Sequence, residues 1–270
     1  MWIPLSLIFL FAFLYVFALR GRTGHPGLPE LRKWHYAHRG LHDSAKPENS
    51  LAAFQAAVNA GFGIELDVHL LSDGELAVIH DSALLRTTGK EGRVEDLTAA
   101  DLSCYHLQGT AEHIPLLKDV LSIVDGKVPL IVEVKSVGGN YAAVTEKTCK
   151  LLEDYTGPYC MESFDPRCVR WLYKNKPQII RGQLAENFLK SGVKAPWVLR
   201  FLLTRQLLNF LIRPDFIAYR YEDRRTPENF LCRKLWKLQG VSWTIKHPND
   251  SQQAVKENWI PIFEGFIPEE

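Results

Sequence analysis

The chain has 270 residues, 46% of them apolar and 23% charged, a composition that allows one large hydrophobic core. Its 32 lysines and arginines nearly balance its 31 aspartates and glutamates, so no global field favours nucleic acid or another polyanion as a partner. The five cysteines are odd in number and contain no C-x-x-C pair, which favours buried free thiols in a reducing compartment.

The first segment, from Trp2 to Leu19, contains no charged side chain. A helix of this length approaches the roughly 30 Å thickness of a bilayer's hydrocarbon core, and Arg20 and Arg22 follow it directly. We therefore expect residues 1–19 to form a single transmembrane anchor, with the following domain on the cytoplasmic side. The alternative is a cleaved secretory signal, although no lysine or arginine precedes the apolar run.

Residues 20–33 are rich in glycine and proline and predict a linker, and residues 34–270 predict one folded domain. In that domain short apolar runs alternate with longer helical patterns, which is typical of a TIM-type (β/α)8 barrel in the α/β class. The expected barrel strands are His35 to Arg39, Ile64 to Leu70, Val128 to Val134, Tyr159 to Phe164, Ile179 to Leu184, Phe216 to Tyr221, Val241 to Ile245 and Ile260 to Phe263.

A ninth apolar run, Glu75 to Ile79, follows the second expected strand after only a few residues. That spacing is too short for a parallel crossover helix, so the run predicts a hairpin that returns over the barrel mouth. Residues 82–115 are polar and irregular, with a weak helical pattern around Thr98 to Tyr105, and predict an insertion after this hairpin.

Polar side chains stand near the carboxyl ends of these strands, the ends that line the active site in such barrels. The first run ends in His38 and Arg39, just before a glycine that permits close approach of a ligand. Without other support, a structural histidine beside a surface ion pair would explain these two residues. Glu65 and Asp67 alternate onto one face of the second strand, and a hard divalent cation would offset the repulsion between them.

The next strand and the hairpin supply further groups. Glu133 and Lys135 share a face, so Glu133 can complete a cage of oxygen ligands while Lys135 holds an anion. An internal ion pair between these two residues is the alternative. His80 ends the hairpin, and with His38 it gives the chain two imidazoles for acid and base catalysis.

Taken together, these groups form an ordered series of motifs. In chain order they are His38-Arg39-Gly40, Pro47-Glu48-Asn49-Ser50, Glu65-x-Asp67, Asp73-Gly74, His80-Asp81 and Glu133-x-Lys135. The series resembles the glycerophosphodiester phosphodiesterase family from about residue 35 onward. Weaker matches continue the resemblance at Ile114-Pro115-Leu116, Ser163-Phe164 and Trp243-Thr244.

The resemblance implies metal-dependent hydrolysis of a glycerophosphodiester to an alcohol and glycerol 3-phosphate. A substrate hydroxyl would attack phosphorus, and water would open the resulting cyclic phosphate. The implied roles are general acid and base for His38 and His80, binding of one Ca²⁺ or Mg²⁺ for Glu65, Asp67 and Glu133, and phosphate binding for Arg39 and Lys135. The residues expected around these groups or in the substrate pocket are Glu48, Asn49, Ser163 and Trp243.

The chain departs from the family pattern on its last two strands. It reads Trp243-Thr244-Ile245-Lys246 where an asparagine is common, and Ile262-Phe263-Glu264-Gly265 where a Thr-Asp pattern is common. Both histidines and all three carboxylates are kept, so the differences fall where the non-phosphate end of the substrate would bind.

One stretch, Trp197 to Ile212, is apolar almost all round and is interrupted or flanked by arginines. Our hypothesis is that it forms a helix that rests on the membrane beside the anchor. The alternative is a buried helix of the barrel.

Three other functions fit parts of the pattern. The chain could act on lysophospholipids in the manner of a phospholipase D, or as a phosphatidylinositol-specific phospholipase C-like lyase that stops at the cyclic phosphate. It could also be an inactive, membrane-tethered binding module for phosphate or lipid, although no histidine or metal carboxylate is lost. We do not expect nucleic acid as a partner, because the near-neutral net charge predicts that basic residues such as Arg224 and Lys234 form only a locally solvated face.

Overall fold

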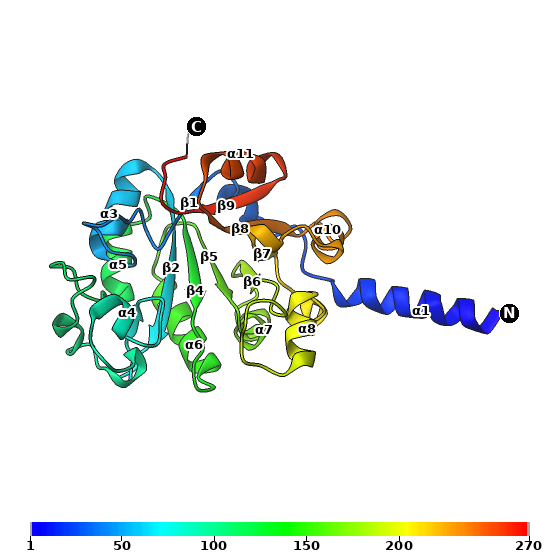
Figure 1. Cartoon of the computed structure of the whole chain (residues 1–270), viewed down its shortest axis with the longest axis horizontal. Helices are drawn as coiled ribbons and strands as arrows, with labels where there is room; N and C mark the ends of the chain where they lie inside the picture. Colours follow the sequence, from blue (N-terminus) through cyan, green and yellow to red (C-terminus); the bar gives the residue numbers. More distant parts are fainter. Residues whose placement is uncertain (1, 269–270) are drawn as a thin grey trace.

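Eight apolar runs of the sequence close into one parallel sheet in the computed structural model, which describes residues 2–268 (Figure 1). The barrel strands are β1 (Tyr36–His38), β2 (Gly63–Leu70), β4 (Leu130–Val134), β5 (Tyr159–Ser163), β6 (Arg181–Ala185), β7 (Phe216–Arg220), β8 (Gln239–Ile245) and β9 (Trp259–Phe263). Because β1 pairs in parallel with both β2 and β9, the sheet closes, and the predicted barrel is confirmed.

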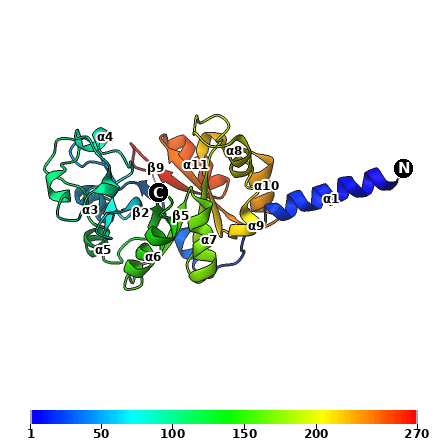
Figure 2. The same cartoon turned by 90° about the horizontal axis from the view of Figure 1, so that it is seen from below.

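The sequence of β4 shows why these runs become barrel strands. All five of its residues are buried, because the barrel interior lies on one face and helices cover the other. The covering helices, seen around the sheet in Figure 2, are α3 (Leu51–Ala60), α5 (Leu117–Val124), α6 (Tyr141–Leu152), α7 (Pro166–Asn175), α10 (Pro227–Lys234) and α11 (Pro248–Lys256).

The predicted hairpin is confirmed as β3 (Leu76–Val78), which pairs antiparallel with the end of β2. The insertion that follows holds α4 (Leu85–Thr88) and the 3₁₀ turns η1 (Val94–Asp96) and η2 (Leu102–Cys104). The insertion and the hairpin pack around a small apolar core that includes Ala77, Leu84 and Ile114. The weak helical pattern around Thr98 to Tyr105 therefore yields only the single 3₁₀ turn η2.

The expectation of one helix from Trp197 to Ile212 is wrong. The segment forms two helices, α8 (Trp197–Thr204) and α9 (Asn209–Ile212). Between them Gln206 is buried and has a φ of 58°, in the left-handed region, which a right-handed helix cannot continue through. The break leaves Trp197 and Val198 more than half exposed at the start of α8.

Helix α1 (Trp2–Ala18) projects away from the barrel in Figures 1 and 2. Its last turns contact the domain, where the Tyr15 hydroxyl donates to Glu228 and the Trp236 indole N–H donates to the Val16 carbonyl. Within residues 2–268 no helix has both the length and the apolar character needed to cross a membrane. The predicted transmembrane span is therefore not supported by the structure.

The segment predicted as a linker, residues 20–33, lies against the barrel. It contains the short helix α2 (Leu28–Leu31), whose two leucines are buried in the same hydrophobic cluster as Tyr36 and Phe216. All five cysteines are free, as expected; four are buried, and Cys104 is exposed.

Candidate active site

Three carboxylates meet at the carboxyl ends of adjacent strands. Strand register sets Glu65 on β2 beside His38 on β1, and Asp67 beside Glu133 on β4. One oxygen from each of Glu65, Asp67 and Glu133 lies within 4.8 Å of the others, and all three side chains are buried. The structure therefore brings together the three residues expected to bind a metal.

The electrostatics of this cluster fit a divalent cation. Burial, followed by repulsion from Asp67, raises the pKa of Glu65 well above its usual value. Burial also raises the pKa of Glu133 to about 7. A hard cation such as Ca²⁺ or Mg²⁺ would relieve this repulsion, and carboxylate oxygens are the ligands it prefers.

Lys135 lies directly beside the carboxylates. Its Nζ is 2.9 Å from Oδ1 of Asp67 and 2.6 Å from Oε1 of Glu133, so the ion pair left open as an alternative does form. Burial opposes ionisation of Asp67, but Lys135, His80 and Arg39 outweigh it and hold the pKa of Asp67 well below its usual value. Lys135 thus places a cation next to the position expected for the substrate's phosphate.

Arg39 is held by two hydrogen bonds, one from its backbone and one from its side chain. Its backbone has a φ of 56°, its backbone N–H donates to Glu65 over 3.1 Å, and its Nη1 donates to Glu48 over 2.8 Å. Gly40 lets this loop lie against α3, because a Cβ there would stand 2.9 Å from the Ala53 carbonyl carbon.

The neighbouring Asn49 donates its side-chain N–H to Oδ2 of Asp67 over 2.9 Å. Glu48 and Asn49 therefore orient the groups that the sequence predicts for phosphate and metal binding. They do so from the loop that ends at the N-cap of α3, where the Ser50 hydroxyl accepts from the Ala53 backbone N–H.

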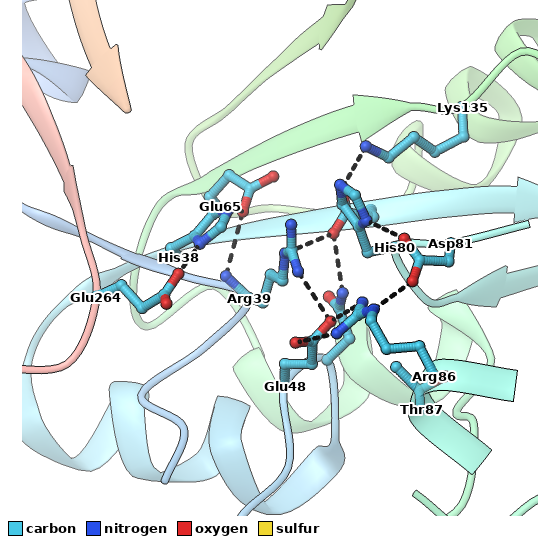
Figure 3. Close-up of polar contacts among 12 residues, drawn as sticks. His38, Arg39, Glu48, Glu65, His80, Asp81, Arg86, Thr87, Lys135 and Glu264 are labelled. Carbon is cyan, nitrogen blue, oxygen red and sulfur yellow. Dashed lines mark hydrogen bonds and ion pairs between the residues drawn. The ribbon is translucent and has the colours of Figure 1, made fainter. Parts of the chain in front are cut away.

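Each predicted catalytic histidine is paired with a carboxylate through Nδ1 (Figure 3). In His38 this atom lies 2.5 Å from Oε2 of Glu264, and in His80 it lies 2.6 Å from Oδ1 of Asp81. A carboxylate at Nδ1 fixes the ring and stabilises its protonated form, which leaves Nε2 to exchange a proton with a ligand.

Burial lowers the pKa of both histidines. The pKa of His80 falls to about 4, while the hydrogen bond to Glu264 partly opposes the effect of burial on the pKa of His38. The neutral form of His80 therefore dominates at pH 7, whereas the contact with Glu264 favours the protonated form of His38.

Three residues at the site, Arg86, Glu264 and Glu162, were not among the site residues predicted from the sequence. Arg86 of α4 donates to both oxygens of Glu48 and to Asp81, so the insertion ties the loop before α3 to the hairpin (Figure 3). Glu264, noted only as a departure from the family pattern, is the partner of His38.

Glu162, on β5, is the third of these groups and pairs in register with Glu133. Its side chain is buried, and burial followed by Glu133 raises its pKa well above the usual value. The sequence does indicate this position, because Glu162, like Glu133 in the preceding strand, is a glutamate within an apolar run.

The remaining two predicted residues contact the backbone. The Ser163 hydroxyl donates to the Val134 carbonyl over 2.7 Å, which fixes the ends of β4 and β5 beside the pocket. The Trp243 indole donates to the Ala218 carbonyl, and its ring packs edge-on against Phe164 at 5.4 Å. Trp243 therefore supports the ring of Phe164, which lines the pocket beside the carboxylates.

A pocket of about 970 Å³ opens over this cluster. One end is lined by His80, Glu133 and Lys135. The other end is lined by apolar side chains, namely Phe164 after β5 and, from α8 and the loop before it, Phe188, Val193, Ala195, Leu199 and Leu203. The pocket thus has a charged end beside the carboxylate cluster and an apolar end, which we call the apolar arm.

Comparison with known sequences gives a consistent result. The profile of the Glycerophosphoryl diester phosphodiesterase family matches residues 38–183. A glycerophosphodiester phosphodiesterase of Caldanaerobacter subterraneus is 31% identical over 237 residues, covering 82% of this chain and 88% of that protein. The rat protein named Lysophospholipase D GDPD1 is 33% identical over 134 residues, 45% of this chain and 41% of its own length.

Solved structures share the fold. A phosphodiesterase from Oleispira antarctica, solved with the product sn-glycerol-3-phosphate, superposes with a TM-score of 0.70 at 21% identity, covering 85% of this chain and 92% of that one. A Silicibacter pomeroyi structure gives a TM-score of 0.71 at 20% identity, covering 89% and 94%.

Proposed function

This chain belongs to the glycerophosphoryl diester phosphodiesterase family of phosphoric diester hydrolases, and we propose that its acid and base are His38 and His80. Glu65, Asp67 and Glu133 would hold one divalent cation, Ca²⁺ or Mg²⁺. The observation that carries the proposal is the meeting of three buried carboxylates with two histidine–carboxylate pairs at one end of the barrel.

The residues divide the chemistry among them. The bound cation would supply positive charge to the phosphoryl oxygens, and Arg39 and Lys135 would hold the same group from the protein side. His80 is neutral at pH 7, and its Nε2 would accept the proton of the attacking substrate hydroxyl. His38, whose protonated form Glu264 stabilises, would donate a proton to the leaving alcohol oxygen.

The products distinguish this function from a lyase. Phosphorus NMR of glycerophosphocholine incubated with the full chain should show glycerol 3-phosphate accumulating, with any cyclic phosphate only transient. A cyclic phosphate that persists as the final product would favour the lyase. No conversion of this substrate or of glycerophosphoethanolamine would favour a lysophospholipid substrate or the binding module.

A lysophospholipid is the second candidate substrate, favoured by the apolar arm of the pocket. Leu199 and Leu203 of α8 line this arm, and an acyl chain could lie along them. Hydrolysis of lysophosphatidylcholine that Leu203→Gln weakens, while glycerophosphocholine hydrolysis is kept, would support this substrate. Equal effects on both substrates would argue against it.

For location, we propose that α1 holds the enzyme at a membrane with the catalytic domain on the cytoplasmic side. Support comes from the exposed apolar side chains of α1, such as Phe9 and Phe13, and from Arg20 and Arg22 just after the helix. Protease protection in sealed vesicles tests the orientation: a domain on the cytoplasmic side is cleaved in inside-out vesicles and protected in right-side-out vesicles.

A further inference from the structure

A second polar pocket lies at the opposite end of the barrel from the active site. Its volume is about 350 Å³, and Arg181, at the start of β6, marks it as belonging to the amino-terminal ends of the strands. Its lining includes Arg20, Arg22, Arg181 and Arg213, together with Tyr173 and Trp236. Among the described residues that line it there is no aspartate or glutamate. We call this the arginine pocket.

The carboxylate of Asp215, which lies close to the arginine pocket, is already paired with Arg22. Both oxygens of Asp215 accept from the Arg22 guanidinium, and Oδ2 also accepts from the Arg181 backbone N–H. Arg22 completes its bonds with the carbonyls of Pro177 and Ile179. Asp215 is therefore bonded to the Arg22 guanidinium and to the Arg181 backbone, and within the described residues it forms no side-chain ion pair with the Arg181 guanidinium.

Arg181 is the buried member of the set. Its side chain is fully buried, its Nε donates to the Ile212 carbonyl over 3.4 Å, and Tyr173 lies over the guanidinium at 5.1 Å. Its terminal nitrogens, Nη1 and Nη2, have no hydrogen-bond partner within the described structure. A buried guanidinium with two unpaired ends is costly unless an anion reaches it.

The electrostatic setting agrees with this geometry. Burial, followed by repulsion from Arg22, lowers the pKa of Arg181 to about 10. Asp215 offsets these effects only in part, so the charged form of Arg181 remains disfavoured in this setting.

Arg20 and Arg213 bring further charge to the arginine pocket. Arg20 stacks over the Trp236 ring at 5.6 Å, and Arg213 donates to the Gly21 carbonyl over 3.4 Å. In residues 2–268 neither forms an ion pair with a carboxylate. Guanidinium groups match the geometry of phosphate oxygens, which several arginines can share.

We propose that the arginine pocket binds a phosphate group, carried either by a phospholipid headgroup or by a free phosphate anion. Its position favours the lipid source, because Arg20 stands two residues beyond the end of α1. The outer part of α1 is an exposed apolar surface, with Phe9 exposed by 72% and Phe13 by 64%. If α1 lies in a bilayer, the arginine pocket stands at the level of the headgroups.

Inorganic phosphate tests the site directly. The full chain in a non-ionic detergent is titrated with inorganic phosphate by calorimetry, beside Arg213→Gln and Arg181→Met. The matched control is Arg32→Gln, the same change at an exposed arginine outside the arginine pocket. We expect each pocket variant to lose about tenfold in affinity, the effect of one charge-assisted contact, and the control to bind as the wild type does.

Vesicles distinguish the two sources of phosphate. The same proteins are floated with vesicles of phosphatidylcholine alone or of phosphatidylcholine with phosphatidic acid. Extra binding to phosphatidic acid that Arg213→Gln removes assigns a lipid headgroup, whereas calorimetric binding without this extra flotation assigns free phosphate. The proposal is overturned if the wild type shows neither, or if Arg213→Gln equals the wild type in both.

Hydrolysis of glycerophosphocholine, measured in parallel, keeps this result separate from the proposed function. Arg213 lies at the far end of the barrel from the catalytic cluster, so Arg213→Gln should retain the wild-type rate and thereby show that it is folded. If Arg181→Met fails to fold, Arg213→Gln still carries the test.

Discussion

Nδ1 of His38 lies 2.5 Å from Oε2 of Glu264, a residue that follows the last barrel strand (Figure 3). The contact joins the first strand of the barrel to the residue that follows its last strand, so the orientation of His38, the proposed acid, depends on closure of the sheet. It also gives a role to a position at which the sequence departs from the common family pattern.

Glu264→Gln should therefore lower kcat by at least about tenfold while leaving KM nearly unchanged, because Gln cannot stabilise a protonated imidazole. The hydrogen bond from His38 holds the pKa of Glu264 at about 2, so this carboxylate is ionised at neutral pH. Rates from pH 5 to 9 are compared with those of Glu222→Gln, the same change at an exposed carboxylate. A uniform loss of activity with an unaltered pH profile would indicate a merely structural role for Glu264.

Binding of Ca²⁺ or Mg²⁺ should raise the melting temperature of the protein, because a ligand that binds only the folded state stabilises it. Asp67→Asn removes a central carboxylate of the cluster and should abolish the rise. Scanning calorimetry with EDTA, Ca²⁺ or Mg²⁺ measures the effect and ranks the two ions. The same rise in both proteins would place metal binding elsewhere.

Acid should weaken the contacts that Glu257, just after α11, makes with Arg224 and Arg225 in the segment before α10. Burial opposes ionisation, but hydrogen bonds from Gln253, Arg225 and Arg224 outweigh it and lower the pKa of Glu257 to about 2. Since the folded pKa lies below the unfolded value of about 4.3, the stabilisation is complete above that value and is lost as the pH falls through about 2.

Urea unfolding of the wild type and Glu257→Gln measures this loss. The difference in free energy of unfolding should be largest near neutrality and shrink on acidification through that range. A difference that does not change with pH would rule out the ionised carboxylate as its source.

One thiol should react rapidly in the folded protein. Cys104 is exposed and the other four cysteines are buried; burial raises the pKa of Cys149 and Cys232 to about 12. A chromogenic disulfide reagent should modify one cysteine in the native state and all five in denaturant. Cys104→Ser should remove the fast phase, and a fast phase that persists would show that a buried thiol is accessible.

The fold could be predicted from the sequence because each barrel strand is buried on both faces and reads as an apolar run. The hairpin could be predicted for a different reason, because the residues between β2 and β3 are too few for a parallel crossover helix. The break at Gln206 was missed because apolar character continues through it, and only the backbone conformation of one residue ends α8.

The carboxylate cluster could be predicted because alternation places Glu65 and Asp67 on one face of one strand. Arg86 could not, since it lies in an irregular insertion and meets Glu48 and Asp81 only through tertiary packing. The arginine pocket was missed for a similar reason: its four arginines are dispersed along the chain, and only the folded barrel gathers them.

The most direct test of the proposed function is the rate of glycerol 3-phosphate release from glycerophosphocholine by the full chain, with Mg²⁺ or Ca²⁺ and with EDTA. The wild type should release product only with metal, and His38→Ala should lose at least about a hundredfold in rate, the low end for general acid catalysis. His106→Ala, at an exposed histidine of the insertion, should match the wild type. Release that persists in EDTA, or that His38→Ala leaves unchanged, would contradict the proposed metal site or the role of His38.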